Sequence, residues 1–91
     1  MKIEARGSEG FIRVLNDSVQ FFSDKENQSA EKVSEFVDRY VVSDKRRQTL
    51  VYVLSLLVAD IVNEDSISAS EVEHRLTKIV LFLDPTELSE E

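Results

Sequence analysis

The chain has 91 residues, 42% of them hydrophobic, with two glycines and one proline, which suits one globular domain with a modest core. It contains no cysteine, and this excludes disulfides, thiolate metal ligands and a cysteine nucleophile. Its net charge of −7 disfavours nucleic-acid backbones and anionic lipid surfaces as general partners.

The N-terminal ten residues contain no apolar run of signal-peptide length, so we expect an intracellular, cytoplasmic protein. The longest uncharged run, Gln48–Ala59, has only twelve residues. Because a membrane-spanning helix needs about 20 apolar residues, no transmembrane segment is predicted.

Residues 1–7 are interpreted as an N-terminal arm of uncertain structure. Ile3 and Ala5 alternate with charged residues, which is compatible with a short edge strand but too brief to specify one. Gly7 and Gly10 disfavour a helix through this region.

The first helix is predicted over residues 8–24, with Ser8 as its N-cap. Apolar residues recur there at three- and four-residue spacings, which places them on one side of a helix. They are Phe11, Ile12, Val14, Leu15, Val19 and Phe22. Residues 24–28 are polar without periodicity and are predicted to be a loop.

The second helix is predicted over residues 29–42, capped by Ser29. Its apolar positions follow the i, i+3, i+4, i+7, i+8 pattern of an amphipathic helix. They are Val33, Phe36, Val37, Tyr40 and Val41. Glu35 and Arg39 stand four residues apart and are expected to pair on the solvent side.

The third helix is predicted over residues 44–63, after a cap at Ser43-Asp44, and it contains the most apolar stretch of the chain, Thr49–Val62. The valines of this stretch are also good strand residues, but its length favours a helix. The main apolar face comprises Leu50, Val53, Leu54, Leu57, Val58 and Ile61. Tyr52, Leu56 and Ala59 lie beyond that face.

The fourth helix is predicted over residues 68–84. Ser68 and Glu71 match a capping box, and Ile67 and Val72 occupy the positions of a hydrophobic staple. We expect the helix to end at Asp84, because the following proline disfavours helical geometry there. Residues 85–91 form an acidic tail. The predicted fold is therefore all-α, a compact four-helix bundle in one domain, residues 8–84, with a central, most-buried third helix.

Two patterns resemble metal sites, and both fail. Glu71-x-x-His74 has the spacing used in di-iron bundles, but it faces away from the apolar side of its helix, and Glu71 already serves the cap. Asp60–Glu71 can be aligned with a calcium loop, yet Val62 stands where an oxygen ligand is needed and Asp65 where glycine is required. Nor does the chain contain a glycine-rich phosphate loop or an arguable catalytic triad. We therefore predict no enzyme activity, catalytic residue, metal, cofactor or small-molecule substrate.

Lys45, Arg46 and Arg47 form the only basic cluster. It could contact phosphates or an acidic partner, or be neutralised by acidic residues of neighbouring helices. Ser68–Leu76 resembles the opening of a helix-turn-helix unit, but no basic recognition helix follows. A nucleic-acid-associated factor that uses this cluster is the alternative function.

Tyr52 and Leu56 allow two interpretations. Either the third helix is covered by the other helices on most sides, or its far side is an interface, to which Phe21, Val42 and Phe82 would add apolar surface. We favour a small acidic protein–protein interaction module that docks on a partner or forms a homodimer, as a regulator, inhibitor or assembly factor. The predicted partner-binding residues are Tyr52 and Leu56, with Lys45, Arg46 and Arg47 giving orientation.

Overall fold

The computed structural model describes residues 3–63 and 67–83, and 73% of them are helical. Within these residues the elements are β1 (Ile3–Glu4), α1 (Gly7–Phe22), η1 (Lys25–Asn27, a short 3₁₀ helix), α2 (Ala30–Val37), β2 (Tyr40–Val41), α3 (Asp44–Ile61) and α4 (Ala69–Val80).

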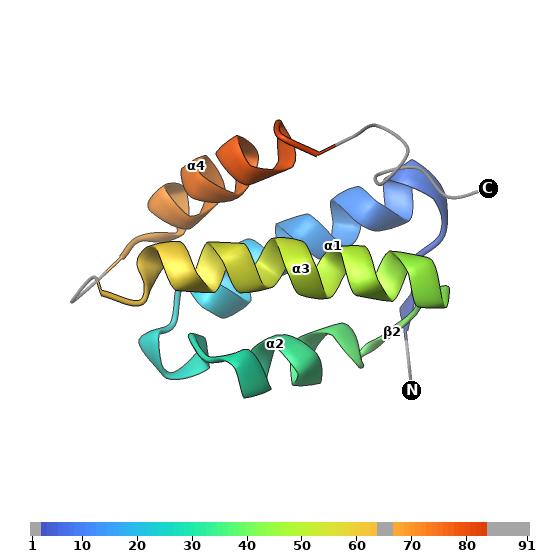
Figure 1. The fold of residues 1–91 in the computed structure, drawn as a ribbon, viewed down its shortest axis with the longest axis horizontal. Coiled ribbons are helices and arrows are strands. Elements are labelled where there is room, and N and C mark those ends of the chain that lie inside the picture. Colours follow the sequence, from blue (N-terminus) through green and yellow to red (C-terminus); the bar gives the residue numbers. More distant parts are fainter. Residues whose placement is uncertain (1–2, 64–66, 84–91) are drawn as a thin grey trace.

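The helices form a flat globule in which α3 lies between α2 and α4, with α1 behind it in the view of Figure 1. α4 also packs against α1, and Phe21 and Phe22 at the end of α1 contact Phe36 of α2. The principal extents are 39 × 30 × 18 Å. Since packed helix axes lie about 8–10 Å apart, the shortest extent leaves room for two layers of helices.

The N-terminal arm is part of the fold. β1 pairs in parallel with β2, with Ile3 opposite Tyr40, and the Ile3 N–H donates to the Arg39 carbonyl at 2.9 Å. Ala5, which follows β1, is buried. Parallel strands require a long crossover connection, and here α1 and α2 provide it.

This pairing corrects the predicted second helix, which ends at Val37 rather than at residue 42. Tyr40 is buried and Val41 is exposed, the alternation of a strand. Tyr and Val favour extended backbone, and as a strand they pair with β1. A further turn of helix would lose this pairing. The expected pair of Glu35 with Arg39 is replaced by an ion pair of Glu35 with Lys32 at 3.3 Å.

The two glycines have specific roles at the start of α1. Gly7 has φ 67°, a left-handed conformation that glycine adopts without strain, and it begins the helix. The N-cap is Arg6, without a side-chain hydrogen bond, so the predicted cap at Ser8 is wrong. A Cβ at Gly10 would lie within 3.0 Å of backbone atoms of Ala5, so this glycine lets the arm approach the helix closely.

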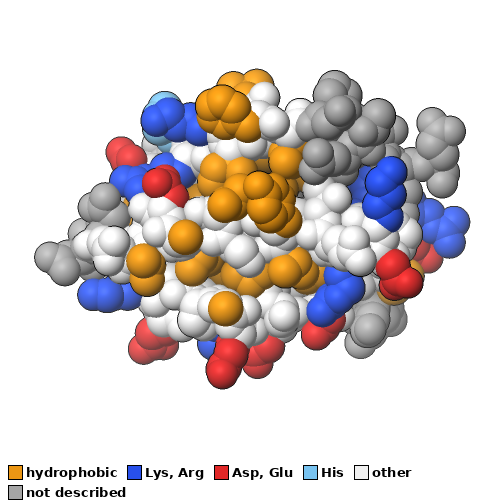
Figure 2. Space-filling view, in the orientation of Figure 1, with side chains coloured by type: hydrophobic (Ala, Val, Ile, Leu, Met, Phe, Trp, Pro, Cys, Tyr) orange, Lys and Arg blue, Asp and Glu red, His pale blue; other side chains and the backbone are white. Residues whose placement is uncertain are grey.

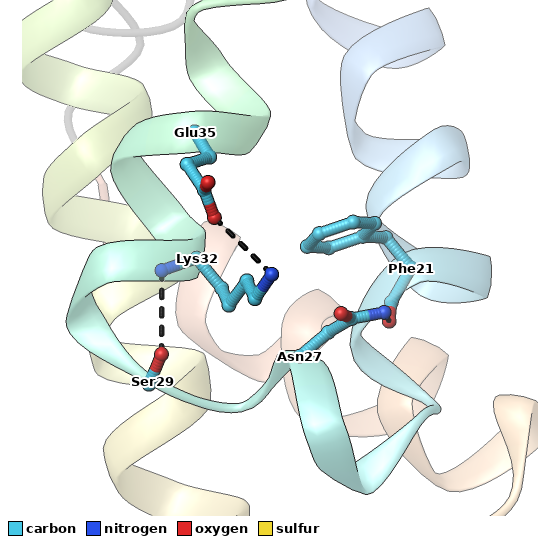
Figure 3. A network of polar contacts seen from close by, with 5 residues as sticks. All are labelled: Phe21, Asn27, Ser29, Lys32 and Glu35. Atoms are coloured by element: carbon cyan, nitrogen blue, oxygen red, sulfur yellow. Dashed lines mark hydrogen bonds and ion pairs between the residues drawn. The ribbon is translucent and has the colours of Figure 1, made fainter.

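Polar contacts order the connection from α1 to α2 (Figure 3). The Asn27 side-chain amide donates to the Phe21 carbonyl at 3.0 Å, which satisfies one of the free carbonyls at the end of α1. Ser29 accepts from the Lys32 N–H at 3.3 Å, so its predicted N-cap role is confirmed. The Lys32 ammonium pairs with Glu35 on the following turn.

The predicted caps of α3 and α4 are confirmed as well. Ser43 Oγ accepts from the Arg46 N–H at 3.2 Å, and Ser68 Oγ accepts from the Glu71 N–H at 3.3 Å. α4 ends at Val80 rather than at residue 84, and the chain then tightens into a turn with a hydrogen bond from the Phe82 N–H to Ile79. Residues 84–91, including the predicted tail, lie outside the described residues.

The core gathers buried side chains from all four α-helices and from the arm. α3 contributes Arg46, Thr49, Leu50, Val53, Leu54, Leu57, Val58 and Ile61. Within residues 3–63 and 67–83, no helix combines the length and the apolar character that crossing a membrane requires.

Candidate protein-docking surface

The side of α3 opposite its buried stripe is exposed, and from Gln48 to Ala59 it carries no charge. We name its residues the α3 outer strip: Gln48, Tyr52, Ser55, Leu56 and Ala59. Tyr52 is 56% exposed and Leu56 is 39% exposed. At these two residues α3 is therefore only partly covered by the rest of the chain, which fits a globule only two helix layers thick.

Hydrophobic side chains gather across this face in Figure 2, over α3 and along its borders with α2 and α4. Acidic side chains line the edge that α2 forms. Beside the strip, an open groove of about 660 Å³ runs between α2 and α3. Its lining residues are Ser34, Asp44, Arg47, Gln48, Val51, Tyr52 and Ser55.

The predicted basic cluster does not lie together on the surface. Arg46 is only 2% exposed, because it precedes Thr49 and Leu50 by three and four residues and so falls on the buried stripe of α3. Its Nη1 donates to the Gly7 carbonyl at 2.7 Å, and its guanidinium carbon lies 5.3 Å from the Phe11 ring centre. Arg46 thus links α3 to the start of α1, and it is not a surface residue.

Arg47 and Lys45 differ in their surroundings. Arg47 is half-buried and its Nη1 lies 2.5 Å from Asp38 Oδ1, so it joins α3 to the end of α2. Lys45 is exposed in the first turn of α3. Tyr52 and Arg47 share the wall of the α2–α3 groove, and Leu56 follows one turn after Tyr52.

The other predicted surface residues are dispersed. Phe21 packs against Phe22 and Phe36, away from the α3 outer strip, and the Arg39 guanidinium lies 4.6 Å from its ring centre. Val42 is partly buried against the core. Phe82, by contrast, is 90% exposed beyond the end of α4.

The two metal-like patterns have ordinary surroundings where the structure describes them. Glu71 and His74 are both exposed on α4. Asp60 pairs with Arg75 of α4 at 3.2 Å, and Arg75 also donates to the Asp60 backbone carbonyl at 2.7 Å. Residues 64–66 of the calcium-like stretch lie outside the described residues.

A polar and aromatic pocket of about 470 Å³ was not predicted from the sequence. The Tyr40 hydroxyl donates to Asp17 Oδ2 at 2.6 Å, and burial together with this carboxylate raises the pKa of Tyr40. Arg39 and Phe21 lie on the pocket wall. Sequence patterns carried no signal for it, because Tyr40 and Arg39 were assigned to opposite sides of a helix that ends before them.

No protein-family model, curated protein or solved structure matches this chain. Function is therefore inferred from the surfaces of the molecule itself.

Proposed function

We propose that this chain is a protein–protein interaction module whose partner docks on the α3 outer strip. One observation carries the proposal. Although 32% of the residues are charged, α3 contains an uncharged run of twelve residues, and Tyr52 and Leu56 within this run are 56% and 39% exposed. Exposed apolar residues within a polar rim are typical of protein-docking sites, and tyrosine is enriched in them.

The architecture that goes with this proposal is a four-helix bundle in which α3 is the central and most-buried helix along one side. Eight of its residues are buried, and α2 and α4 flank it. Its other side would then be the binding surface. A helix held by two neighbours is a rigid support, which lowers the entropy that must be lost when a partner docks.

Charges at one end of the strip would orient the partner. Lys45 is exposed in the first turn of α3, so an acidic group on the partner is favoured there. The nucleic-acid alternative is weakened, because Arg46 is buried and Arg47 is engaged by Asp38. We propose a binding role in the cytoplasm, without catalysis or a cofactor.

The test is affinity capture from an extract of the source cell with the wild-type chain and with Tyr52→Glu or Leu56→Asp. A carboxylate in an apolar interface is desolvated without a partner, so we expect each substitution to reduce the captured partner at least tenfold. Gln20→Glu adds the same charge at an exposed position of α1 and should capture the partner as the wild type does.

Circular dichroism shows whether each variant is folded. If folded Tyr52→Glu and Leu56→Asp capture the same proteins as the wild type, the α3 outer strip is not the binding surface. If both substitutions unfold the chain, these residues belong to the core, and the proposal fails.

A further inference from the structure

A second apolar surface lies on another side of the molecule, between α1 and α4. We name it the α1–α4 groove; its volume is about 190 Å³. Its lining residues are Ile12, Leu15, Asn16, Val19, Glu73, Leu76, Thr77, Val80 and Leu81. Binding pockets for drug-sized ligands measure about 300–1,000 Å³, so this groove suits one or two side chains of a protein instead.

Two consecutive large apolar side chains stand exposed just after the end of α4, where Leu81 lines the groove. Leu81, which lines it, is 78% exposed, and Phe82 is 90% exposed. Ile12, on the α1 wall of the groove, is 56% exposed. Three such residues together form an unusually exposed apolar cluster for a small, highly charged chain.

We propose that a second copy of this chain covers the α1–α4 groove, with Phe82 of each copy inserted into the groove of the other. The same chain carries both the groove and the residue that fits it. A two-fold axis near the end of α4 therefore satisfies both contacts at once, as the isologous interface of a homodimer does.

Charge supports a second copy at this site. Each copy has a net charge of −7, so two copies repel each other unless they meet where acidic residues are scarce. Of the nine residues that line the groove, Glu73 alone is charged. The groove lining therefore brings only one carboxylate per copy into the contact.

The apolar area available for this contact is small. The exposed parts of Phe82, Leu81 and Ile12 present on the order of 400 Å² per copy, since an aromatic side chain alone accounts for about 200 Å². With flanking residues, the total is about 1,000 Å² for both copies, the lower limit for a specific interface. A weak, concentration-dependent dimer is the consequence.

Sedimentation equilibrium of the full chain tests this. The average mass should rise from the monomer value of 10.4 kDa toward twice that value between roughly 10 µM and 1 mM. Added salt should strengthen the dimer, because it screens the repulsion between two acidic copies. A mass that stays monomeric up to 1 mM overturns the proposal.

Two substitutions separate the two halves of the contact. Phe82→Asp removes the inserted side chain and Ile12→Asp alters the groove wall, so each alone should raise the dissociation constant at least tenfold. Both positions are exposed, and circular dichroism verifies that the variants are folded. An equimolar mixture of the two should associate more tightly than either alone, because one groove and one Phe82 remain intact in the mixed pair.

Tyr52→Glu is the matched control, since it lies on the α3 outer strip. It should leave the dimer unchanged, so this proposal and the proposed function can fail separately. If Tyr52→Glu abolishes the dimer while Phe82→Asp does not, self-association uses α3 instead, and the groove proposal is wrong. Failure of the mixed variants to associate would also contradict it.

Discussion

Tyr40 holds together three parts of the chain that are far apart in the sequence. It lies on β2, its hydroxyl donates to Asp17 of α1, and its ring centre is 5.5 Å from that of Phe36 on α2. The sequence predicted correctly that Tyr40 is buried, because both a helix and a strand can turn that position inward. The hydrogen bond to Asp17 had no counterpart in any pattern of spacing.

At this scale we predict a loss of stability at high pH. Burial and Asp17 raise the pKa of Tyr40 in the folded state, so the folded chain retains a proton that the unfolded chain loses above its ordinary pKa of about 10. The stabilisation is present below that pH and should decline above it by up to about 1.4 kcal/mol per pH unit.

Urea unfolding at pH 7, 10 and 11 measures this effect. Tyr40→Phe keeps the ring but lacks the titrating hydroxyl, so its free energy of unfolding should fall less steeply above pH 10. At pH 7 the free energy of unfolding of the variant should be about 1 kcal/mol lower than that of the wild type, because the variant lacks the hydrogen bond to Asp17. Equal slopes for the two proteins would show that Tyr40 does not carry the pH dependence.

Helix ends depend on two kinds of signal, and only one of them is local. Ser29, Ser43 and Ser68 cap the helices that follow them, as their local sequences predicted. The end of α2 was predicted five residues too late. Tyr40 and Val41 instead form a strand, because they pair with β1 at the N-terminal end of the chain. The start of α1 is set by Gly7 in the left-handed region instead of by the Ser8 side chain.

At this scale the serine caps give a prediction with an internal control. Ser43→Ala removes the acceptor of the Arg46 N–H and should lower the free energy of unfolding by about 1 kcal/mol. Ser8→Ala should change it by less than about 0.5 kcal/mol, since Ser8 is exposed and is not the cap of α1. Thermal and urea unfolding of both variants would provide the comparison, and equal losses would contradict the assigned caps.

At the scale of the whole molecule, Arg46 joins α3 to the first residue of α1. The sequence grouped it with Lys45 and Arg47 as a surface cation, because three adjacent basic residues usually face solvent. Helical geometry separates them, since consecutive residues point about 100° apart. Arg46 falls on the buried stripe, and Lys45 falls on the exposed side.

We therefore predict different consequences for two neighbouring cations. Arg46→Ala leaves the Gly7 carbonyl without this donor and Phe11 without this contact, and should destabilise the fold by about 2–3 kcal/mol. Lys45→Ala should change stability by less than about 0.5 kcal/mol. Denaturant unfolding of both variants measures the difference; equal and small losses would mean that Arg46 has no structural role.

The amino-acid sequence by itself determined the four helices, most of their apolar faces and three of their N-caps, because these depend on residues within a few turns of one another. Tertiary structure decided the pairing of β1 with β2, the burial of Arg46 and the exposure of Tyr52 and Leu56. It also brought Ile12 of α1 and Leu81 together in one groove. Each of these features joins segments distant in the chain, so it follows from how the helices are layered, which spacing within any single helix does not encode.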